Sequence, residues 1–312
     1  NYLESSNRIS GNGLFSIVDF QFTPRDSSAT CDTLDLALNC VFDKPYDFYV
    51  ETNYTGRTSG RMGPGLIVGF TKRNVFRGGE KLDINIKGSY EWQSGHTASG
   101  TSDNMNSYEY GGDASLEFPR LIMPFLQHRR FFTTPSTILK ASTDIINRAG
   151  YFKRHIASGE LTYTFQTSKN SMHQFSPIIL EYEYMTSHTE KFDSVMKTSP
   201  YLQVSMKNQF IPKMKYSYIY TSDKTYRNPI WWQTTISEAA NILSLGYTIA
   251  GKSWSEKDKK MFKNPYAQYV KIETEFRKTW RLAEHSTLVA HLDLGAIWAY
   301  GNSDMAPWSE QF

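Results

Sequence analysis

The sequence has little cysteine: its 312 residues include only Cys31 and Cys40. Two cysteines are too few for a disulfide framework. If residues 33–42 form one extended strand, the two thiols lie roughly 30 Å apart at about 3.3 Å per residue, too far to bridge without a sharp bend. Cys40 shares a face of that strand with Leu34, Leu36, Leu38 and Phe42. We therefore expect Cys40 to be a small buried apolar residue without a redox role.

Long apolar runs and an excess of one charge are also absent. No run reaches the roughly 18 apolar residues of a membrane-spanning helix. The mean hydropathy is −0.50, which is typical of a soluble chain, although a transmembrane barrel gives the same average because its strands alternate. The 34 basic and 31 acidic residues nearly balance, so the sequence predicts no nucleic-acid partner.

Signatures of enzymes and metal sites are missing. The sequence contains no GxSxG, HExxH or P-loop motif, and no helix follows RGGEK at 77–81 to cradle a phosphate. His285 and His291 have poor spacing for a metal. Paired carboxylates such as Glu273 and Glu275 could indicate acid–base chemistry, but Lys271 beside them favours a solvated charged surface. We therefore predict a non-enzymatic protein without catalytic residues, cofactor or metal.

The two ends of the sequence indicate a longer parent chain. The first residue is Asn1 instead of methionine, no signal peptide is present, and we expect both ends to continue in the native protein. Residues 1–45 form a small α+β pattern, with a helix at 2–11, a strand at 15–24 and a strand at 33–42. Pro45 marks the end of this unit, and residues 46–312 follow a different pattern.

Eleven strands are predicted after Pro45, and no helical pattern of comparable length separates them, which argues against parallel βαβ units. The predicted strands are 47–55, 65–72, 81–93, 108–118, 136–148, 156–166, 177–185, 209–222, 230–240, 266–280 and 286–300.

Each of these strands alternates apolar and polar residues. In 81–93, Leu82, Ile84 and Ile86 alternate with charged or polar residues, and 286–300 repeats the pattern. A soluble β-sandwich also alternates, but strands of ten to fifteen residues exceed the usual length of about five or six. Aromatic residues gather near strand ends, as in the interfacial bands of membrane barrels. These residues are Tyr90, Trp92, Phe118, Tyr184, Tyr220, Trp231, Trp232, Trp280, Trp298 and Tyr300.

The pattern therefore predicts an all-β transmembrane antiparallel β-barrel, with lipid against the apolar face. If the first strand runs outward from the 1–45 unit, the connections on the outer side are longer than those on the inner side, with 119–135 the exception. In the connection 186–208, Phe192 and Met196 have helical spacing, which predicts a short helix there.

Four segments in order resemble the BamA/TamA-type outer-membrane assembly family, and together they cover nearly the whole chain. Between the second and third strands, the turn motif comprises Asn74, Phe76, Gly78, Gly79 and Glu80. The strands before Pro45 resemble the last POTRA domain running into the barrel. The segment 115–125, SLEFPRLIMPF, is similar to the family's link between strands four and five, in a Bacteroidetes-like form. The end of the chain is similar to the lead-in to the family's sixth outer loop, with Pro307, Glu310 and Phe312.

The resemblance implies a sixteen-stranded barrel, of which eleven strands are present. The tip of the sixth loop and the last strands are not in the sequence. An open sheet would leave unpaired backbone groups in lipid, so we expect the native protein to have the remaining strands. Residues 1–45 would then be part of a periplasmic POTRA domain, and 46–312 the first portion of the barrel.

The first strand is the predicted functional element. It comprises Phe48, Tyr49, Val50, Glu51, Thr52, Asn53 and Tyr54, and it is short and poor in aliphatic residues. Such a strand would form a weak seam, and an opened seam can pair with an incoming strand by β-augmentation. The resemblance implies this use: a lateral gate that templates nascent outer-membrane proteins. An ordinary first strand without gating is the alternative. For the turn motif, the residues alone favour an ordinary hairpin turn.

We therefore predict an outer-membrane assembly or translocation factor. Its partners would be nascent outer-membrane proteins, outer-membrane lipids and accessory periplasmic or lipoprotein subunits. An outer-membrane porin or transporter with a water-filled lumen is the main alternative, and a soluble β-rich binding protein is the third. Within the family, the sequence does not separate the general insertase from the TamA/TamL-like branch. The segment 115–125 slightly favours the TamA/TamL-like branch.

Overall fold

The computed structural model describes residues 5–6, 9–11, 13–25, 33–56, 61–93, 106–123, 131–199, 206–223, 225–257, 259–261 and 263–311. Within these ranges, one large antiparallel sheet contains eleven strands. They are β3 (Tyr46–Gly56), β4 (Arg61–Arg73), β5 (Lys81–Gln93), β6 (Ser107–Phe118), β7 (Ser136–Arg148), β8 (Phe152–Ser168), β9 (Ser171–His188), β10 (Gln209–Thr221), β11 (Ile230–Ala239), β14 (Tyr269–Ala283) and β15 (Ser286–Ala299).

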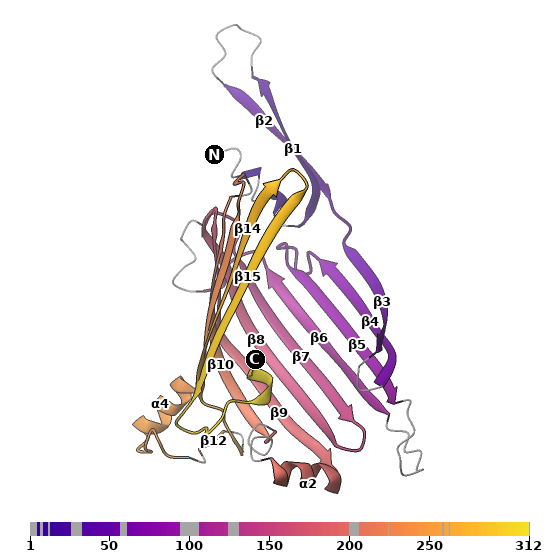
Figure 1. Ribbon diagram of the computed structural model, residues 1–312. Helices are drawn as coiled ribbons and strands as arrows, with labels where there is room; N and C mark the ends of the chain where they lie inside the picture. Colours follow the sequence, from indigo (N-terminus) through magenta and orange to yellow (C-terminus); the bar gives the residue numbers. More distant parts are fainter. Residues whose placement is uncertain are drawn as a thin grey trace.

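The order of the strands in this sheet follows the chain. Each strand pairs with the next, from β3 at one edge to β15 at the other. The sheet curves strongly, so that β14 and β15 face the β3–β9 part across an interior (Figure 1). The prediction of eleven antiparallel strands is confirmed. The described strands form an open sheet and not a closed barrel, because β3 and β15 do not pair with each other.

The two ends of the sheet carry different connections. One end has tight turns between β8 and β9 and between β14 and β15, and the hairpin of β1 (Phe15–Pro24) and β2 (Leu34–Phe42) adjoins it. We call this the hairpin end. The opposite end, the helical end, carries α2 (Glu190–Thr198), α4 (Asn241–Ile249) and the short pair β12 (Lys260–Met261) and β13 (Asn264–Pro265) (Figure 1).

Of these helices, α2 was predicted and α4 was not. Thr189 caps α2 by accepting a hydrogen bond from the Phe192 backbone N–H, and Phe192 is buried against Phe152. In contrast, α4 begins after Ala240 without a side-chain cap and contains β-branched Ile242, Thr248 and Ile249. These features give a weak helix signal in a sequence. Neither helix has the length and apolarity to span a membrane.

The alternation in the sequence produces two chemically different faces. Ile86, Leu292 and Leu294 are 62%, 53% and 59% exposed, on the side that we call the outer face. The opposite, inner face carries charged residues in pairs, such as Lys87 Nζ and Asp144 Oδ1 at 2.7 Å. The predicted division of the residues between two faces is therefore confirmed. A soluble sheet would bury its apolar side in a core, whereas here side chains such as Ile86 and Leu294 on that side are left uncovered.

Two further clusters of buried apolar residues lie within the described part of the chain. At the helical end, Ile211, Ala239, Ala267 and Tyr269 form one cluster. At the hairpin end, Leu121, Phe131 and Tyr163 form the other, where part of the 119–135 connection lies against β8. The Tyr163 hydroxyl donates to the Ile122 carbonyl at 3.1 Å. This long connection thus folds back on the sheet, which explains why it breaks the rule of short turns at this end.

In the N-terminal segment, the expectation for Cys40 needs correction, and the expected helix is only partly described. Cys40 is half-buried instead of buried, because the apolar face of β2 is uncovered, with Leu34 and Phe42 61% and 67% exposed. Half of the residues in the expected helix at 2–11 lie outside the described residues. The β1–β2 hairpin is a separate two-stranded sheet, and β3 begins at Tyr46, directly after the predicted boundary. The POTRA assignment of residues 1–45 stays a prediction.

Candidate functional site at the edge strand and the inner face

The edge strand β3 carries the predicted gate residues, and it pairs only with β4 among the described strands. Phe48, Val50 and Tyr54 point to the outer face and are 68%, 54% and 62% exposed. Tyr49, Glu51 and Asn53 alternate with them toward the inner face, and Thr52 lies between on the outer side. The far side of β3 therefore has backbone groups without a strand partner in the described part of the chain.

Glycines in β4 leave β3 with few opposing side chains on the inner face. Tyr49 pairs with Gly69 and Asn53 pairs with Gly65, so neither has a side-chain partner across the strand. The Tyr49 ring occupies the free space: a Cβ on Gly69 would lie only 2.0 Å from Tyr49 Cε1. Because cross-strand side-chain pairs stabilise a sheet, the β3–β4 pairing lacks this support at two positions of its inner face.

A polar chain connects Tyr49 to the sheet beyond β4. The Tyr49 hydroxyl donates to Asn85 Oδ1 at 2.8 Å, and Asn85 Nδ2 donates to Asp113 Oδ2 at 3.1 Å. Lys140 Nζ lies 3.9 Å from the same Asp113 oxygen. We call Tyr49, Asn85, Asp113 and Lys140 the Tyr49 chain. It links β3 to β5, β6 and β7 over the side-chain-free position at Gly69, and the sequence alone did not indicate it.

The turn motif between β4 and β5 is held by its own side chains. The Asn74 side-chain oxygen accepts from the Gly79 N–H at 3.0 Å, and Glu80 Oε2 accepts from the Gly78 N–H at 2.9 Å. Gly79 has φ +84°, a conformation that favours glycine. Phe76 is exposed. These contacts explain the motif as a self-contained turn, and they give no direct evidence of a client contact.

Glu80 is the charged centre of this turn. Burial raises the pKa of its carboxyl group, but backbone N–H donors, at Glu80 itself, Gly78 and Phe76, and the charge of Arg120 outweigh burial. The net pKa of Glu80 is therefore below its ordinary value. The ionised carboxylate is the form that the turn stabilises.

The C-terminal segment, including the short helix η1 (Trp308–Glu310), folds against the inner face (Figure 1). Pro307 is fully buried. Glu310 pairs with Lys213, whose Nζ also lies 2.8 Å from Glu181 Oε2. Predicted residues Pro307 and Glu310 are thus placed inside the curve of the sheet, while Phe312 lies outside the described residues. The partner of Glu310, Lys213, is about one hundred residues away in sequence. The only sequence signal for this contact is the alternation that places Lys213 on the inner face.

The predicted gate, turn and C-terminal residues are not brought together in one site. The gate strand is at one edge, the turn is at the hairpin end, and Glu310 contacts β10 in the opposite wall. Among the described residues, no group of three or more His, Cys, Asp or Glu could hold a metal ion.

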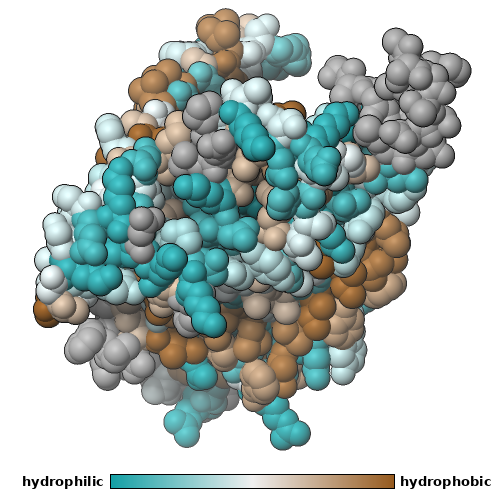
Figure 2. All heavy atoms as spheres, turned by 90° about the horizontal axis from the view of Figure 1, so that it is seen from below, coloured by the Kyte–Doolittle hydropathy of each residue, from teal (hydrophilic) through white to brown (hydrophobic). Residues whose placement is uncertain are grey.

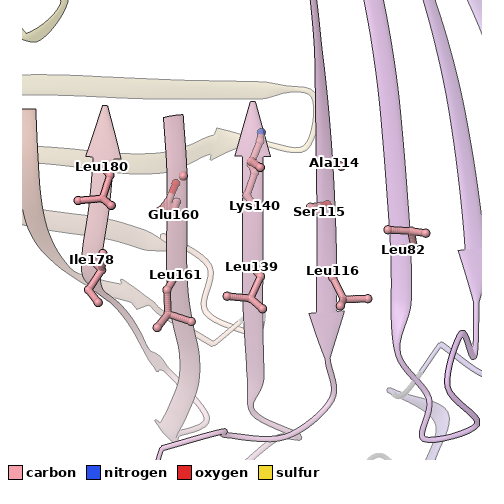
Figure 3. A pocket seen from close by; sticks show the side chains of 12 residues that line it. Leu82, Ala114, Ser115, Leu116, Leu139, Lys140, Glu160, Leu161, Ile178 and Leu180 are labelled. Atoms are coloured by element: carbon pink, nitrogen blue, oxygen red, sulfur yellow. The ribbon is translucent and has the colours of Figure 1, made fainter. Parts of the chain in front are cut away.

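The outer face has the composition of a lipid-contacting surface. Leucine and isoleucine side chains from five neighbouring strands, β5 to β9, stand in one row along a shallow furrow (Figure 3): Leu82, Leu116, Leu139, Leu161 and Ile178. Seen from the helical end, hydrophobic residues gather along the rim of the wall, and hydrophilic ones cover the nearby connections (Figure 2).

Exposed aromatic residues lie toward the two ends of this face. Tyr54, Tyr90 and Trp298 are exposed toward the helical end, and Tyr46 and Trp232 toward the hairpin end. The prediction that Trp231 belongs to an aromatic band is wrong. Trp231 is on the inner side of β11, where the Arg277 guanidinium lies 4.6 Å from its ring centre. Strict alternation allows only one of two consecutive tryptophans to face outward.

Comparison with known proteins finds likeness among solved structures alone. No protein-family model matches the chain, and no curated protein matches it. Among solved structures, the chain is similar to BamA from Haemophilus ducreyi lacking POTRA domains 1–3, at 9% sequence identity and a TM-score of 0.29, covering 95% of this chain and 78% of that one. At this TM-score the likeness carries no inference about fold or function.

Proposed function

We propose that this chain is the barrel-forming part of an outer-membrane protein of the BamA/TamA type, which assembles or translocates other outer-membrane proteins by strand templating at β3. The observation that carries the proposal is the edge position of β3 in a sheet whose uncovered face is apolar. The sequence resemblance at the turn motif and at Pro307 and Glu310 supports the same family.

The membrane placement follows from the two faces of the sheet. Lipid is the environment that accepts uncovered side chains such as Ile86 and Leu294, while the inner face keeps its charges in pairs. Exposed aromatic residues toward the two ends match the interfacial bands of membrane barrels. The N-terminal segment would then lie in the periplasm, because it adjoins the hairpin end.

Templating at β3 uses ordinary backbone chemistry. An edge strand offers a row of N–H and C=O groups that an incoming strand can pair with. The glycines opposite Tyr49 and Asn53 weaken side-chain support for the β3–β4 pair, and the Tyr49 chain restores part of it. The strand is thus held in place without strong packing, which suits a seam that opens and closes. Nascent outer-membrane proteins are the proposed clients, with accessory periplasmic or lipoprotein subunits as further partners.

Site-specific photocrosslinking in cells tests this function. A photoreactive residue at Val50 in β3 should capture newly made outer-membrane proteins. The matched control is Ile86 in β5, which is equally apolar and exposed on the outer face but lies away from the edge. Capture at both positions, or at neither, would contradict templating at β3.

A disulfide lock supplies a second test of the same function. One cysteine replaces Val50 or Thr52, and the other is placed on the strand that closes the barrel in the full protein. Under oxidising conditions, we expect membrane-protein assembly and growth to stop, and to recover on reduction. Continued assembly with the seam locked would exclude lateral gating.

A porin or transporter is the second candidate, favoured by the charged inner face. Pairs such as Lys215 with Glu160 and Lys271 with Glu273 line that side of the sheet. Size-selective ion conductance of the full protein in planar bilayers would support a pore. A soluble β-rich protein, the third candidate, would stay in the aqueous phase without detergent.

A further inference from the structure

The helix α4 exposes apolar side chains of the kind that a surface helix of a soluble domain would bury. Ile242, Leu245 and Ile249 lie on one side of α4 and are 67%, 53% and 81% exposed. The opposite side carries Ser244, which is fully buried, and Tyr247. A helix on a water-facing surface buries its apolar stripe and exposes its polar side.

Buried polar contacts fix this orientation of α4. The Lys259 ammonium is completely buried and donates to Ser244 Oγ at 3.1 Å and to the carbonyl oxygens of Ser253 and Trp254 at 3.2 and 2.9 Å. The Ser244 hydroxyl in turn donates to Gln268 Oε1 at 3.2 Å. Turning the apolar stripe inward would leave these buried groups without hydrogen-bond partners, so α4 cannot hide the stripe by rotating.

The other helix at the same end shows the usual arrangement. Both α2 and α4 have nine residues. In α2, Phe192 is buried, and charged Glu190, Asp193 and Lys197 surround it. In α4, no residue is charged. The exposed apolar stripe is therefore a property of α4 and is not imposed by its position at the helical end.

One hydrogen bond attaches α4 to a residue of the outer face, Glu238. Glu238 of β11 pairs with Met214 and Val270, and Val270 pairs with the exposed Trp298 of the outer face. The Glu238 carboxylate accepts a hydrogen bond from the backbone N–H of Asn241, the first residue of α4, at 3.1 Å. Figure 1 shows α4 on the far side of the β10–β14 wall from the C-terminal segment, beside the ends of the strands.

We propose that α4 is a membrane-surface anchor whose apolar stripe lies at the boundary between lipid head groups and acyl chains. The inference rests on the proposed membrane placement of the outer face. The helix lies beside the strand ends at the helical end, and its first residue is hydrogen-bonded to Glu238 of the outer face.

A protein partner fits this stripe less well. A stable protein interface needs about 800 Å² from each partner and a central cluster of anchors. Three aliphatic side chains on a nine-residue helix supply much less. Lipid requires no such area, because the wall already holds the protein in the bilayer and α4 adds only local contact.

Fluorescence quenching in vesicles tests the anchor. In the full protein, Cys31 and Cys40 are replaced by serine, and single cysteines are introduced as Ile249→Cys in α4, Lys197→Cys in α2 or Ile86→Cys in the wall. Each variant is labelled with an environment-sensitive fluorophore after insertion into phosphatidylcholine vesicles with or without brominated acyl chains. Heat-dependent gel migration checks that each variant is folded.

We expect the probe at 249 to lose most of its emission in brominated vesicles, as the probe at 86 does, while the probe at 197 keeps its emission. Quenching at 86 but not at 249 would overturn the anchor and leave the membrane placement intact. No quenching at either position would overturn both. Protection of the probe at 249 from brominated lipid and from aqueous iodide would mean that a second copy covers α4, and would also overturn the anchor. Photocrosslinking at Val50 tests templating independently.

Discussion

At the scale of single residues, Tyr49 is the main support of the edge strand. Its ring fills the space above Gly69, and its hydroxyl reaches Asn85 on β5. The contact is possible because β4 has no side chain at the position between them. Tyr49 thus connects β3 to β5, a strand with which β3 does not pair. This contact is a defined attachment of the proposed gate strand to the rest of the sheet.

Tyr49→Phe should loosen β3 without disturbing the wall. The substitution keeps the ring over Gly69 but removes the hydrogen bond to Asn85, worth about 1 kcal/mol. Hydrogen exchange of the β3 amides should become faster. The control is Tyr54→Phe, in the same strand but on the outer face. If both variants exchange equally fast, the Tyr49 chain does not hold the edge.

Glu80 makes the turn motif sensitive to acid. Because its pKa in the folded turn is below the value of about 4.3 in an unfolded chain, the ionised carboxylate stabilises the turn above that pH. This stabilisation is lost as the pH falls through the lower folded pKa. Hydrogen exchange at Phe76 and Gly78, corrected for intrinsic rates, should reveal the loss.

The matched variants separate Glu80 from general effects of acid. E80Q should exchange rapidly at neutral pH and lose most of the pH dependence. The control E284Q changes an exposed carboxylate in the turn between β14 and β15, at the same end of the sheet. A normal pH response in E80Q would show that another group controls the turn.

At the scale of elements, the C-terminal segment is held to the wall by one shared cation. Lys213 on β10 lies between Glu181 on β9 and Glu310 in η1, and its side chain is only 12% exposed. Buried charges of this kind depend on their partners, since an unpaired buried carboxylate is costly. The position of η1 is therefore decided by strands that precede it by about one hundred residues.

Lys213→Gln should release the C-terminal segment. The substitution leaves Glu181 and Glu310 without their cation, which costs about 3 kcal/mol at a buried pair. Limited proteolysis should then cut more readily within 306–311. Lys215→Gln is the control on the same strand and face, where the partly exposed pair with Glu160 at 3.9 Å is worth at most about 1 kcal/mol. Equal protection of both variants would refute this role of Lys213.

At the scale of the whole molecule, two faces of opposite chemistry define the sheet. The uncovered apolar side, the paired charges on the inner side and the aromatic residues toward both ends fit a wall between lipid and water. The apolar stripe of α4 extends the same surface beyond the strands. The two edges, β3 and β15, are where such a wall would meet further strands or a client.

Neighbouring substitutions on β15 test this placement. Leu292→Arg puts a charge on the outer face and should destabilise the folded protein in bilayers by roughly 2–4 kcal/mol. His291→Arg changes the adjacent inner residue, whose Nε2 lies 2.8 Å from Glu275 Oε1, and should be tolerated. Urea unfolding in vesicles measures both. Equal tolerance of the two variants would contradict contact between Leu292 and lipid.

The sequence by itself determined the strands and their two faces. Alternation is local and fixes which side chains share a side, so the strands at 81–93 and 136–148 were predicted with their observed bounds. The helix near Phe192 was also visible in its spacing. A strand such as β8, predicted at 156–166, is longer in the structure, because its hairpin partners continue the ladder to Phe152 and Ser168.

Only the tertiary structure decided which distant residues meet. Tyr49 reaches Asn85 because a glycine intervenes, and Glu310 reaches Lys213 because the sheet curves around the C-terminal segment. The exposed stripe of α4 depends on a buried lysine that comes ten residues after the helix ends. Such contacts join residues that no local pattern relates, since their geometry is set by strand pairing and by the curvature of the whole sheet.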